Sequence, residues 1–206
     1  MSARVTGARA RRRQALVDEI AEAADQLVHE EGLAGWSMRD LGTRVGLHSS
    51  SLYQYFPSKL DIYDALFARW HQQLQEWMDG FDRDGDPEEV FRTGSARFTA
   101  FCTADPVRYQ LLFQRTIADF EPSDESMALA RASFADLAGV LARLGIVDPA
   151  HLDLWRAVQM GLTDQQLANE PGGDRWTAQL DRAIDMFLAY VRPRRTSRRP
   201  RAVGGS

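Results

Sequence analysis

Residues 37–66 of this 206-residue chain read SMRDLGTRVGLHSSSLYQYFPSKLDIYDAL, and this stretch decides the fold. Two short helical segments are separated by Val45-Gly46-Leu47, and a longer helical segment follows Pro57. Short helices joined by a tight turn that contains glycine are typical of a helix-turn-helix unit. Residues 45–58 contain no Asp, Glu, Lys or Arg, although these residues make up 26% of the chain.

Local capping signals predict where the helices of this unit begin. Ser37 with Asp40 three residues later resembles a capping box, which predicts a helix over about residues 37–45. A second short helix is expected over residues 49–55. Apolar residues at helical spacing then predict a longer helix over residues 58–79.

The second helix has the composition expected of a helix that enters the major groove of DNA. It has no carboxylate to oppose the phosphates, and its serines keep the approaching face narrow. Gln54 can pair with adenine, and tyrosine hydroxyls can donate to phosphate oxygens. Leu52 and Phe56 are expected to face the core. Tyr53 and Tyr55 have a simpler alternative interpretation as core aromatics.

Helical periodicity extends over the rest of the chain. Apolar residues one helical turn apart predict a helix over residues 14–31. Three Asp-Pro pairs mark later helix starts, because Asp is a good N-cap and Pro a good first helical residue. No stretch alternates as a strand would, so we expect an all-α fold of about nine helices. The helices after the unit are expected over about residues 87–103, 106–119, 123–144, 149–169 and 174–191.

The chain divides into two expected domains. The loop FDRDGD at residues 81–86 is the predicted boundary between a domain over residues 14–74 and a second over residues 86–192. Residues 1–13 and 193–206 are rich in arginine and are expected to be flexible basic tails.

Charge is uneven along the chain. Residues 61–191 hold 22 acidic and 11 basic side chains, whereas residues 192–206 hold six basic and no acidic ones. Five arginines precede the first acidic residue, Asp18. A basic N-terminus beside an uncharged helix favours a polyanion as partner, and the acidic middle would be repelled by it. Terminal basic runs are otherwise solvated tails.

Composition argues against several functional classes. No run approaches the roughly 18 apolar residues of a membrane span, and we see no signal peptide, so a cytoplasmic protein without membrane contact is expected. Cys102 is the only cysteine and is interpreted as a small buried hydrophobic residue. The four histidines lack metal-ligand spacing, and no catalytic constellation is evident. We therefore expect no metal, no cofactor and no enzymatic activity.

The sequence IAEAADQLVHEEG at residues 20–32, together with residues 37–66, resembles the N-terminal domain of TetR-family transcriptional regulators. The similarity covers about residues 14–74. The segment from Leu52 to Phe56 and the pair Ser58-Lys59 are in register with the family pattern. Beyond this region the chain is similar to the family only in length and helical layout.

The resemblance implies a DNA-binding surface at matching positions. Arg39 matches a position that reaches a base or phosphate in some members, and Lys59 matches a phosphate-holding lysine. His48 stands where many members carry a small N-cap residue, so the cap is open to a shift to Ser49. The residues expected to contact DNA are Ser37, Arg39, His48, Ser49, Ser50, Ser51, Tyr53, Gln54, Tyr55 and Lys59.

The resemblance also implies a role for the C-terminal region, which would hold a small effector and form a homodimer. The aromatic density there suggests an apolar or aromatic ligand, lined by Phe98, Phe101, Tyr109, Phe113 and Phe134. The last two helices would pair with their copies through Trp155, Val158, Leu162, Leu180, Ile184 and Phe187. The expected function is a ligand-released repressor that binds double-stranded DNA at a palindromic operator. The alternatives are a helical adaptor without DNA activity, and an activator with the same fold.

Overall fold

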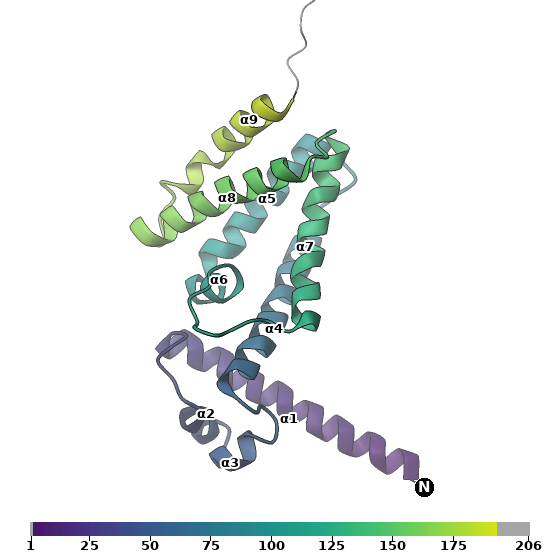
Figure 1. The fold of residues 1–206 in the computed structure, drawn as a ribbon, viewed down its shortest axis with the longest axis vertical. Coiled ribbons are helices and arrows are strands. Elements are labelled where there is room, and N and C mark those ends of the chain that lie inside the picture. The colour runs from purple at the N-terminus through teal and green to yellow at the C-terminus, as the bar shows by residue number, and fades with distance from the viewer. Residues whose placement is uncertain (1, 193–206) are drawn as a thin grey trace, which may run out of the picture.

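A computed structural model describes residues 2–192 of the chain, so the predicted tail at 193–206 lies outside the described residues. Within the described range the chain forms nine α-helices, one short 3-10 helix at Thr177–Gln179 and no strand, which confirms the all-α prediction. Figure 1 shows α1 to α3 at one end of the molecule, α8 and α9 at the other, and α4 running between them. The helices are α1 (Ser2–Glu31), α2 (Met38–Arg44), α3 (Ser49–Leu52), α4 (Lys59–Asp79), α5 (Pro87–Ala104), α6 (Pro106–Phe113), α7 (Asp124–Arg143), α8 (Pro149–Asn169) and α9 (Leu180–Val191).

The predicted helix starts are confirmed. The Ser37 hydroxyl accepts a hydrogen bond from the Asp40 backbone N–H, and Asp40 accepts one from the Ser37 N–H at 2.9 Å, which completes the capping box. Asp86, Asp105 and Asp148 each cap a helix whose first residue is proline. These caps satisfy backbone N–H groups that no helix can pair internally.

The first helix is longer than expected. Residues 2–13 continue α1 as helix, whereas we predicted a flexible tail before residue 14. The segment is rich in alanine and arginine, which are strong helix formers, and it has no proline. It extends a helix already nucleated where Ile20 and Leu27 pack into the core.

Three other helices have different limits from those predicted. Helix α3 ends at Leu52 rather than residue 55, because Phe56 precedes Pro57 and such a residue avoids the helical region. Helix α6 ends at Phe113 rather than at residue 119; the next residue, Gln114, donates its side-chain N–H to Asp164 at 2.7 Å. Helix α9 begins at residue 180 rather than 174, after the 3-10 turn.

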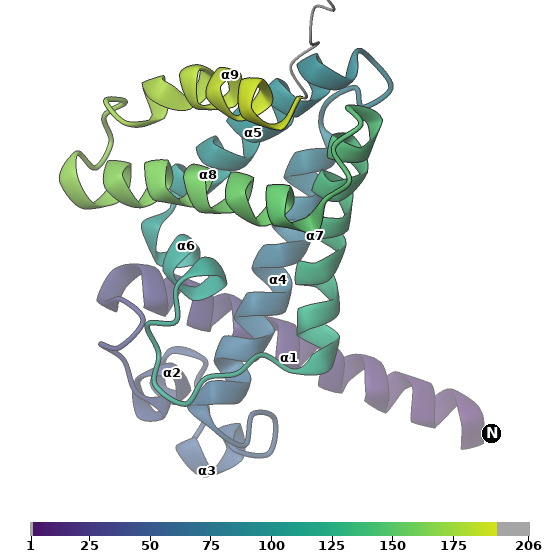
Figure 2. The ribbon, with the colours of Figure 1, turned by 45° about the horizontal axis from the view of Figure 1, so that its top comes forward.

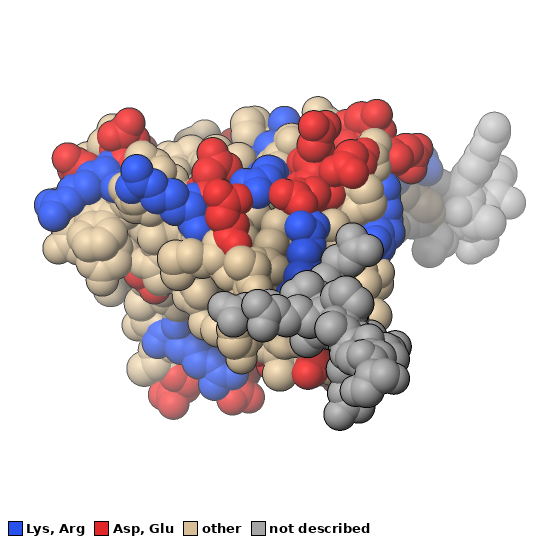
Figure 3. All heavy atoms as spheres, turned by 90° about the horizontal axis from the view of Figure 1, so that it is seen from above, with Lys and Arg blue, Asp and Glu red and all other residues tan. Residues whose placement is uncertain are grey.

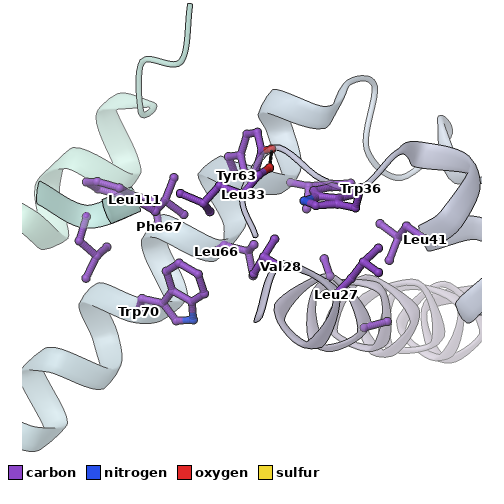
Figure 4. Packing of buried hydrophobic residues seen from close by; sticks show 14 of the residues in the cluster. Leu27, Val28, Leu33, Trp36, Leu41, Tyr63, Leu66, Phe67, Trp70 and Leu111 are labelled. Carbon is purple, nitrogen blue, oxygen red and sulfur yellow. Dashed lines mark hydrogen bonds between the residues drawn. The ribbon is translucent and has the colours of Figure 1, made fainter. Parts of the chain in front are cut away.

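The larger hydrophobic core lies around the first half of α4 and joins it to α1, α2 and α3 (Figure 4). Leu41, Leu52 and Leu66 are fully buried in it. The Tyr63 hydroxyl donates to the Leu33 carbonyl, drawn as a dashed line in Figure 4. The same core continues into α5, α6 and α7, so it crosses the boundary that we predicted at residues 81–86.

The smaller core joins α8 and α9 to α5 and α7. Trp155 lies at its centre, with ring centroids 4.9 Å from Phe91 and 5.3 Å from Phe187. Figure 2 shows α8 crossing in front of α5, with α9 packed beside both. The two cores together make α4 and α5 the elements that connect both ends of the molecule.

Polar contacts fasten the N-terminal helices to the rest of the chain. His29 on α1 lies 2.7 Å from the Asp105 carboxylate, which caps α6. Asp64 on α4 accepts a hydrogen bond from the Ser123 N–H at 2.8 Å. Among residues 2–192, no helix is long and apolar enough to cross a membrane.

Candidate DNA-binding surface

Two glycines set the turn between α2 and α3. A Cβ on Gly42 would lie 2.8 Å from the Leu47 carbonyl oxygen, closer than real side chains approach. The Leu47 N–H donates to the Gly42 carbonyl at 2.8 Å, which closes the turn. Gly46 has a φ of +68°, a conformation that favours glycine. This turn fixes the angle at which α3 leaves α2.

Two residues that we predicted for the core, Leu52 and Phe56, anchor helix α3. Leu52 is fully buried and Phe56 is 5% exposed, both in the larger core. Because these two side chains point inward, the remaining side chains of the segment must lie around the outer side. The short helix is therefore a rigidly placed part of the surface.

The outer side of residues 48–55, here called the α3 face, brings together most of the predicted DNA contacts. His48, Ser50 and Gln54 are exposed, and Tyr53 is 48% exposed. The remaining residues of the face are half-buried: Ser49, Ser51 and Tyr55. His48 is the N-cap of α3, so the cap does not shift to Ser49, although the His48 side chain makes no capping hydrogen bond. Figure 1 shows α3 at the end of the molecule farthest from α9.

On α2, Arg39 is exposed beside the α3 face and has no ion pair among the described residues. Ser37 is differently engaged, since its hydroxyl donates to Asp40 at 2.6 Å. Hydrogen bonds from the Ser37 side chain and backbone hold the pKa of Asp40 below its usual value. The observed role of Ser37 is thus to start α2.

Lys59 makes internal contacts. Its ammonium donates to the Trp36 carbonyl at 2.6 Å and lies 4.2 Å from the centre of the Trp36 ring. Burial lowers the pKa of Lys59, and the Asp40 charge opposes that effect. Lys59 therefore ties the start of α4 to the loop after α1. The predicted phosphate contact remains a prediction.

Arg13 also lies beside the α3 face, a position that the sequence alone did not predict. The long α1 brings its guanidinium within 3.4 Å of the Gln54 carbonyl oxygen and 5.5 Å from the Tyr55 ring centre. The arginine run at residues 9–13 was a signal of basic charge, but only the helical continuation of α1 shows which arginine meets α3.

The opposite end of the molecule has a different electrostatic character. Figure 3 shows that end with basic and acidic side chains side by side. Arg92 pairs there with Glu88 at 2.9 Å, and Arg192 pairs with Glu88 at 2.7 Å. The α3 face, by contrast, carries no carboxylate between residues 45 and 58. No carboxylate of residues 45–58 therefore repels a polyanion at the α3 face.

The predicted ligand-lining aromatics separate into two groups. Phe98, Phe113 and Phe134 line a cavity among α4, α5, α7 and α8. Phe101 and Tyr109 do not line this cavity, so the prediction that they contact a ligand gains no support from it. Phe101 is buried under the guanidinium of Arg108, and the Tyr109 hydroxyl donates to Asp164 at 2.9 Å.

Most of the predicted dimer residues are buried within the chain itself. Trp155, Leu180, Ile184 and Phe187 belong to the smaller core and are at most 7% exposed, so their side chains cannot reach a partner. An apolar helix face has the same pattern in sequence whether it packs internally or on a second copy, and this caused the error. Two other predicted residues are half-buried: Val158 and Leu162. The large apolar residues that are exposed on α8 and α9 are Leu154, Met186 and Tyr190.

Known proteins share both the sequence of the N-terminal region and the fold. Residues 20–66 match the sequence profile described as bacterial regulatory proteins, tetR family. The HTH-type transcriptional repressor DrrR1 of Streptomyces coeruleorubidus is 40% identical over 53 residues. That match covers 26% of this chain and spans only 20% of the length of DrrR1.

Solved structures resemble the whole chain at lower identity. The TetR-family regulator PfmR of Thermus thermophilus has a TM-score of 0.61 at 21% identity, over 82% of this chain and 97% of its own. FadR of Bacillus subtilis, in complex with stearoyl-CoA, has a TM-score of 0.61 at 16% identity, over 84% and 98%. A TetR variant of Acinetobacter baumannii, in complex with minocycline, has a TM-score of 0.58 at 17% identity, over 83% and 93%. Residues 20–66 thus match the tetR family of bacterial regulatory proteins, and the chain as a whole shares the fold of solved TetR-family regulators.

Proposed function

We propose that this protein is a sequence-specific DNA-binding transcriptional regulator that acts as a homodimer and leaves DNA when a small ligand binds. The observation that carries the proposal is the α3 face: exposed, rich in hydroxyl and amide groups, free of carboxylates and held rigidly by Leu52 and Phe56. Such a face can enter the major groove, where side-chain hydroxyls and amides read base edges. The name of DrrR1 as a repressor favours repression over activation.

In a homodimer, a twofold axis would relate the two α3 faces and match the symmetry of a palindromic operator. Leu154, Met186 and Tyr190 are large apolar side chains exposed on α8 and α9, at 40%, 71% and 72%. Pairing of α8 and α9 with their copies would remove them from water. Two α3 helices would then enter successive major grooves about 34–36 Å apart, on a palindromic site.

Ligand release would act through α4, which carries residues of the DNA-binding end and of the cavity. Its first half packs under α3 in the larger core, and His71, Leu74 and Met78 of its second half line the cavity. A ligand that prefers one tilt of α4 would shift the population towards dimers with the wrong α3 spacing. Linkage then requires that DNA weaken ligand binding by the same factor. Relatives in this fold are known with stearoyl-CoA and with minocycline, two unlike ligands.

The test is selection of DNA from a pool of random duplexes at about 150 mM salt, a concentration that must be stated because phosphate contacts are salt-dependent. A palindrome with half-sites one helical turn apart is expected. Gln54→Glu puts a carboxylate on the α3 face and should abolish recovery. Gln72→Glu adds the same charge on exposed α4 surface and should leave recovery intact.

Failure would be informative because folding and assembly are measured alongside. Sedimentation should give a dimer, and circular dichroism should give a helical spectrum. Folded dimer that selects no sequence, with and without candidate ligands, would contradict the proposal and favour a helical adaptor. A reporter gene behind the selected operator separates repression from activation by the sign of the change.

A further inference from the structure

Two cavities adjoin in the C-terminal part of the molecule and share one wall. The inner cavity, about 90 Å³, lies among α4, α5, α7 and α8. The outer cavity, about 710 Å³, lies between α4, α6 and α8 and reaches the segment after α6. The shared wall, here called the junction, consists of residues that line both: His71, Phe113, Phe134, Arg156 and Met160.

Polar atoms without protein partners gather at the inner cavity. Within residues 2–192, ten buried side-chain nitrogen or oxygen atoms have no hydrogen-bond partner in the protein. Five of these ten belong to residues that line this cavity: both ring nitrogens of His71, the Ser95 and Ser133 hydroxyls, and Nε of Arg156. An unpaired buried polar atom is costly, so such a concentration indicates a site that a ligand completes.

His71 is the most deeply placed of these groups. It lies on α4, is 1% exposed, and is enclosed by the rings of Phe67 and Phe113 at 4.5 and 6.0 Å between centroids. Burial lowers the pKa of His71 to about 4, so the ring is neutral at pH 7. A neutral imidazole offers one hydrogen-bond donor and one acceptor to whatever enters the junction.

Arg156 supplies positive charge at the same wall. Its guanidinium stacks on the Phe134 ring at 3.9 Å from the centroid, and its only ion-pair partner among the described residues, Asp153, is 3.5 Å away. The other charged pair at the inner cavity is Arg83 with Asp136, at 2.9 Å. Asp136 is thus already neutralised, and Arg156 Nε remains the donor with no acceptor.

The remaining lining residues of the inner cavity indicate the chemical character of the non-acidic part of the ligand. They are almost entirely aliphatic or aromatic, with Leu74, Met78, Phe91, Phe98, Leu137 and Val140. A largely apolar cavity of about 90 Å³ favours a single small ring or a branched hydrocarbon group. The outer cavity gives access from solvent and room for the rest of a larger molecule.

We propose that the junction binds the acidic group of a small aromatic or alicyclic acid, with Arg156 Nε and His71 as hydrogen-bonding partners and the ring in the inner cavity. A carboxylate accepts charge-assisted hydrogen bonds from a guanidinium, which are stronger than neutral ones. The inference rests on the proposed function in one respect only, namely that this acid is the effector. Binding itself requires no DNA, so the two can fail separately.

The experiment compares benzoate with benzamide, which has nearly the same shape but no charge. Titration calorimetry on the full chain without DNA gives each dissociation constant. We expect benzoate to bind at least tenfold more tightly than the amide. Equal affinities, or no heat from either probe at millimolar concentration, would overturn the proposal.

Variants identify the residues responsible. Arg156→Gln should remove the preference for the acid while binding of the amide persists. Arg131→Gln removes the same charge from exposed α7 surface outside both cavities and should keep the preference. A preference that survives in Arg156→Gln would overturn the proposal.

His71 is tested with a pair of substitutions. His71→Leu removes both hydrogen-bonding atoms and should weaken benzoate binding about tenfold, whereas His71→Gln keeps a donor and an acceptor and should retain most of the affinity. The helical circular dichroism signal and the unfolding midpoint verify that each variant is folded. Unchanged affinity in His71→Leu would overturn the assignment of His71.

Discussion

The two halves of α4 differ in how completely their polar groups are paired. In the first half, Lys59 donates to the Trp36 carbonyl and Tyr63 donates to the Leu33 carbonyl. In the second half, both nitrogens of His71 lack a protein partner, beside a cavity. The first half is thus fixed by its own hydrogen bonds, whereas the second half, although Gln75 and Trp77 are paired, carries one buried imidazole with no protein partner.

The same contrast extends to the regions around each half. Of the ten buried unpaired side-chain atoms among the described residues, only Trp36 Nε1 lies before residue 71. Complete pairing and a filled core make an element rigid, which suits a surface that must match the shape of DNA. Polar groups without partners around a cavity can form hydrogen bonds to a ligand, and these bonds contribute to its binding free energy. The difference therefore predicts opposite responses to substitution in the two halves.

The largest effect is expected from Leu66→Ala. Leu66 is fully buried at the centre of the larger core, so its truncation leaves a cavity between α1 and α4. We expect a loss of about 2–5 kcal/mol in the free energy of unfolding, measured in urea. Val147→Ala, at a site that is 78% exposed between α7 and α8, is the control and should cost far less. Similar losses at both sites would mean that the first half of α4 is not the rigid part.

His71 should behave in the opposite way. Removing an unpaired buried polar group is not destabilising by that mechanism, so His71→Leu should match or exceed the wild-type stability at pH 7. The pH dependence of the folding stability is a more specific test of His71. The folded pKa of about 4 lies below the unfolded value of 6.5, so the unfolded chain binds the extra proton between these values. Wild-type stability at this group is therefore present above pH 6.5 and falls by up to about 3 kcal/mol towards pH 4.

The measurement is urea unfolding at several pH values for wild type, His71→Leu and His71→Gln. The pKa values of His29 and Asp25 are also raised from their usual values, so only the difference between wild type and variant reports on His71. His151→Leu, at a half-buried position on α8, serves as the control. Parallel curves for wild type and His71→Leu would contradict a buried neutral imidazole.

The sequence predicted the first half of α4 and the helices around it much better than the second half and the cavity beside it. Capping boxes, glycine turns and helical spacing are local signals, and they located α2, α4 and the inward positions of Leu52 and Phe56 correctly. The cavity depends on which aromatic rings from four helices meet, and no local pattern distinguishes Phe98, which lines it, from Phe101, which does not. Nor does the apolar face of α9 reveal that Ile184 packs internally. His71 was one of four scattered histidines until the fold placed it at the junction.

On the rigid side, single residues of the α3 face should have distinct effects on DNA. Gln54→Ala should relax the preference at one base pair of the selected operator, by about 1–3 kcal/mol of discrimination. Tyr53→Ala should weaken binding to all sequences alike, because a phosphate contact carries no base information. Binding to a set of single-base operator variants, followed by fluorescence anisotropy, measures both. A uniform loss in Gln54→Ala would place that side chain on the phosphate backbone.

The smallest effect is expected from Arg13, which connects the α1 extension to the α3 face. Its guanidinium is exposed, close to the Gln54 carbonyl, and positioned by helix rather than by a flexible tail. If each copy in the homodimer neutralises one phosphate, Arg13→Gln should reduce the slope of log affinity against log salt by about 1.8. The affinity lost is then about twelvefold greater at 50 mM than at 200 mM salt. Arg131→Gln is the control for net charge. An unchanged slope in Arg13→Gln would mean that α1 only buttresses α3, and that the salt dependence of the α3 end arises from Arg39 and Lys59.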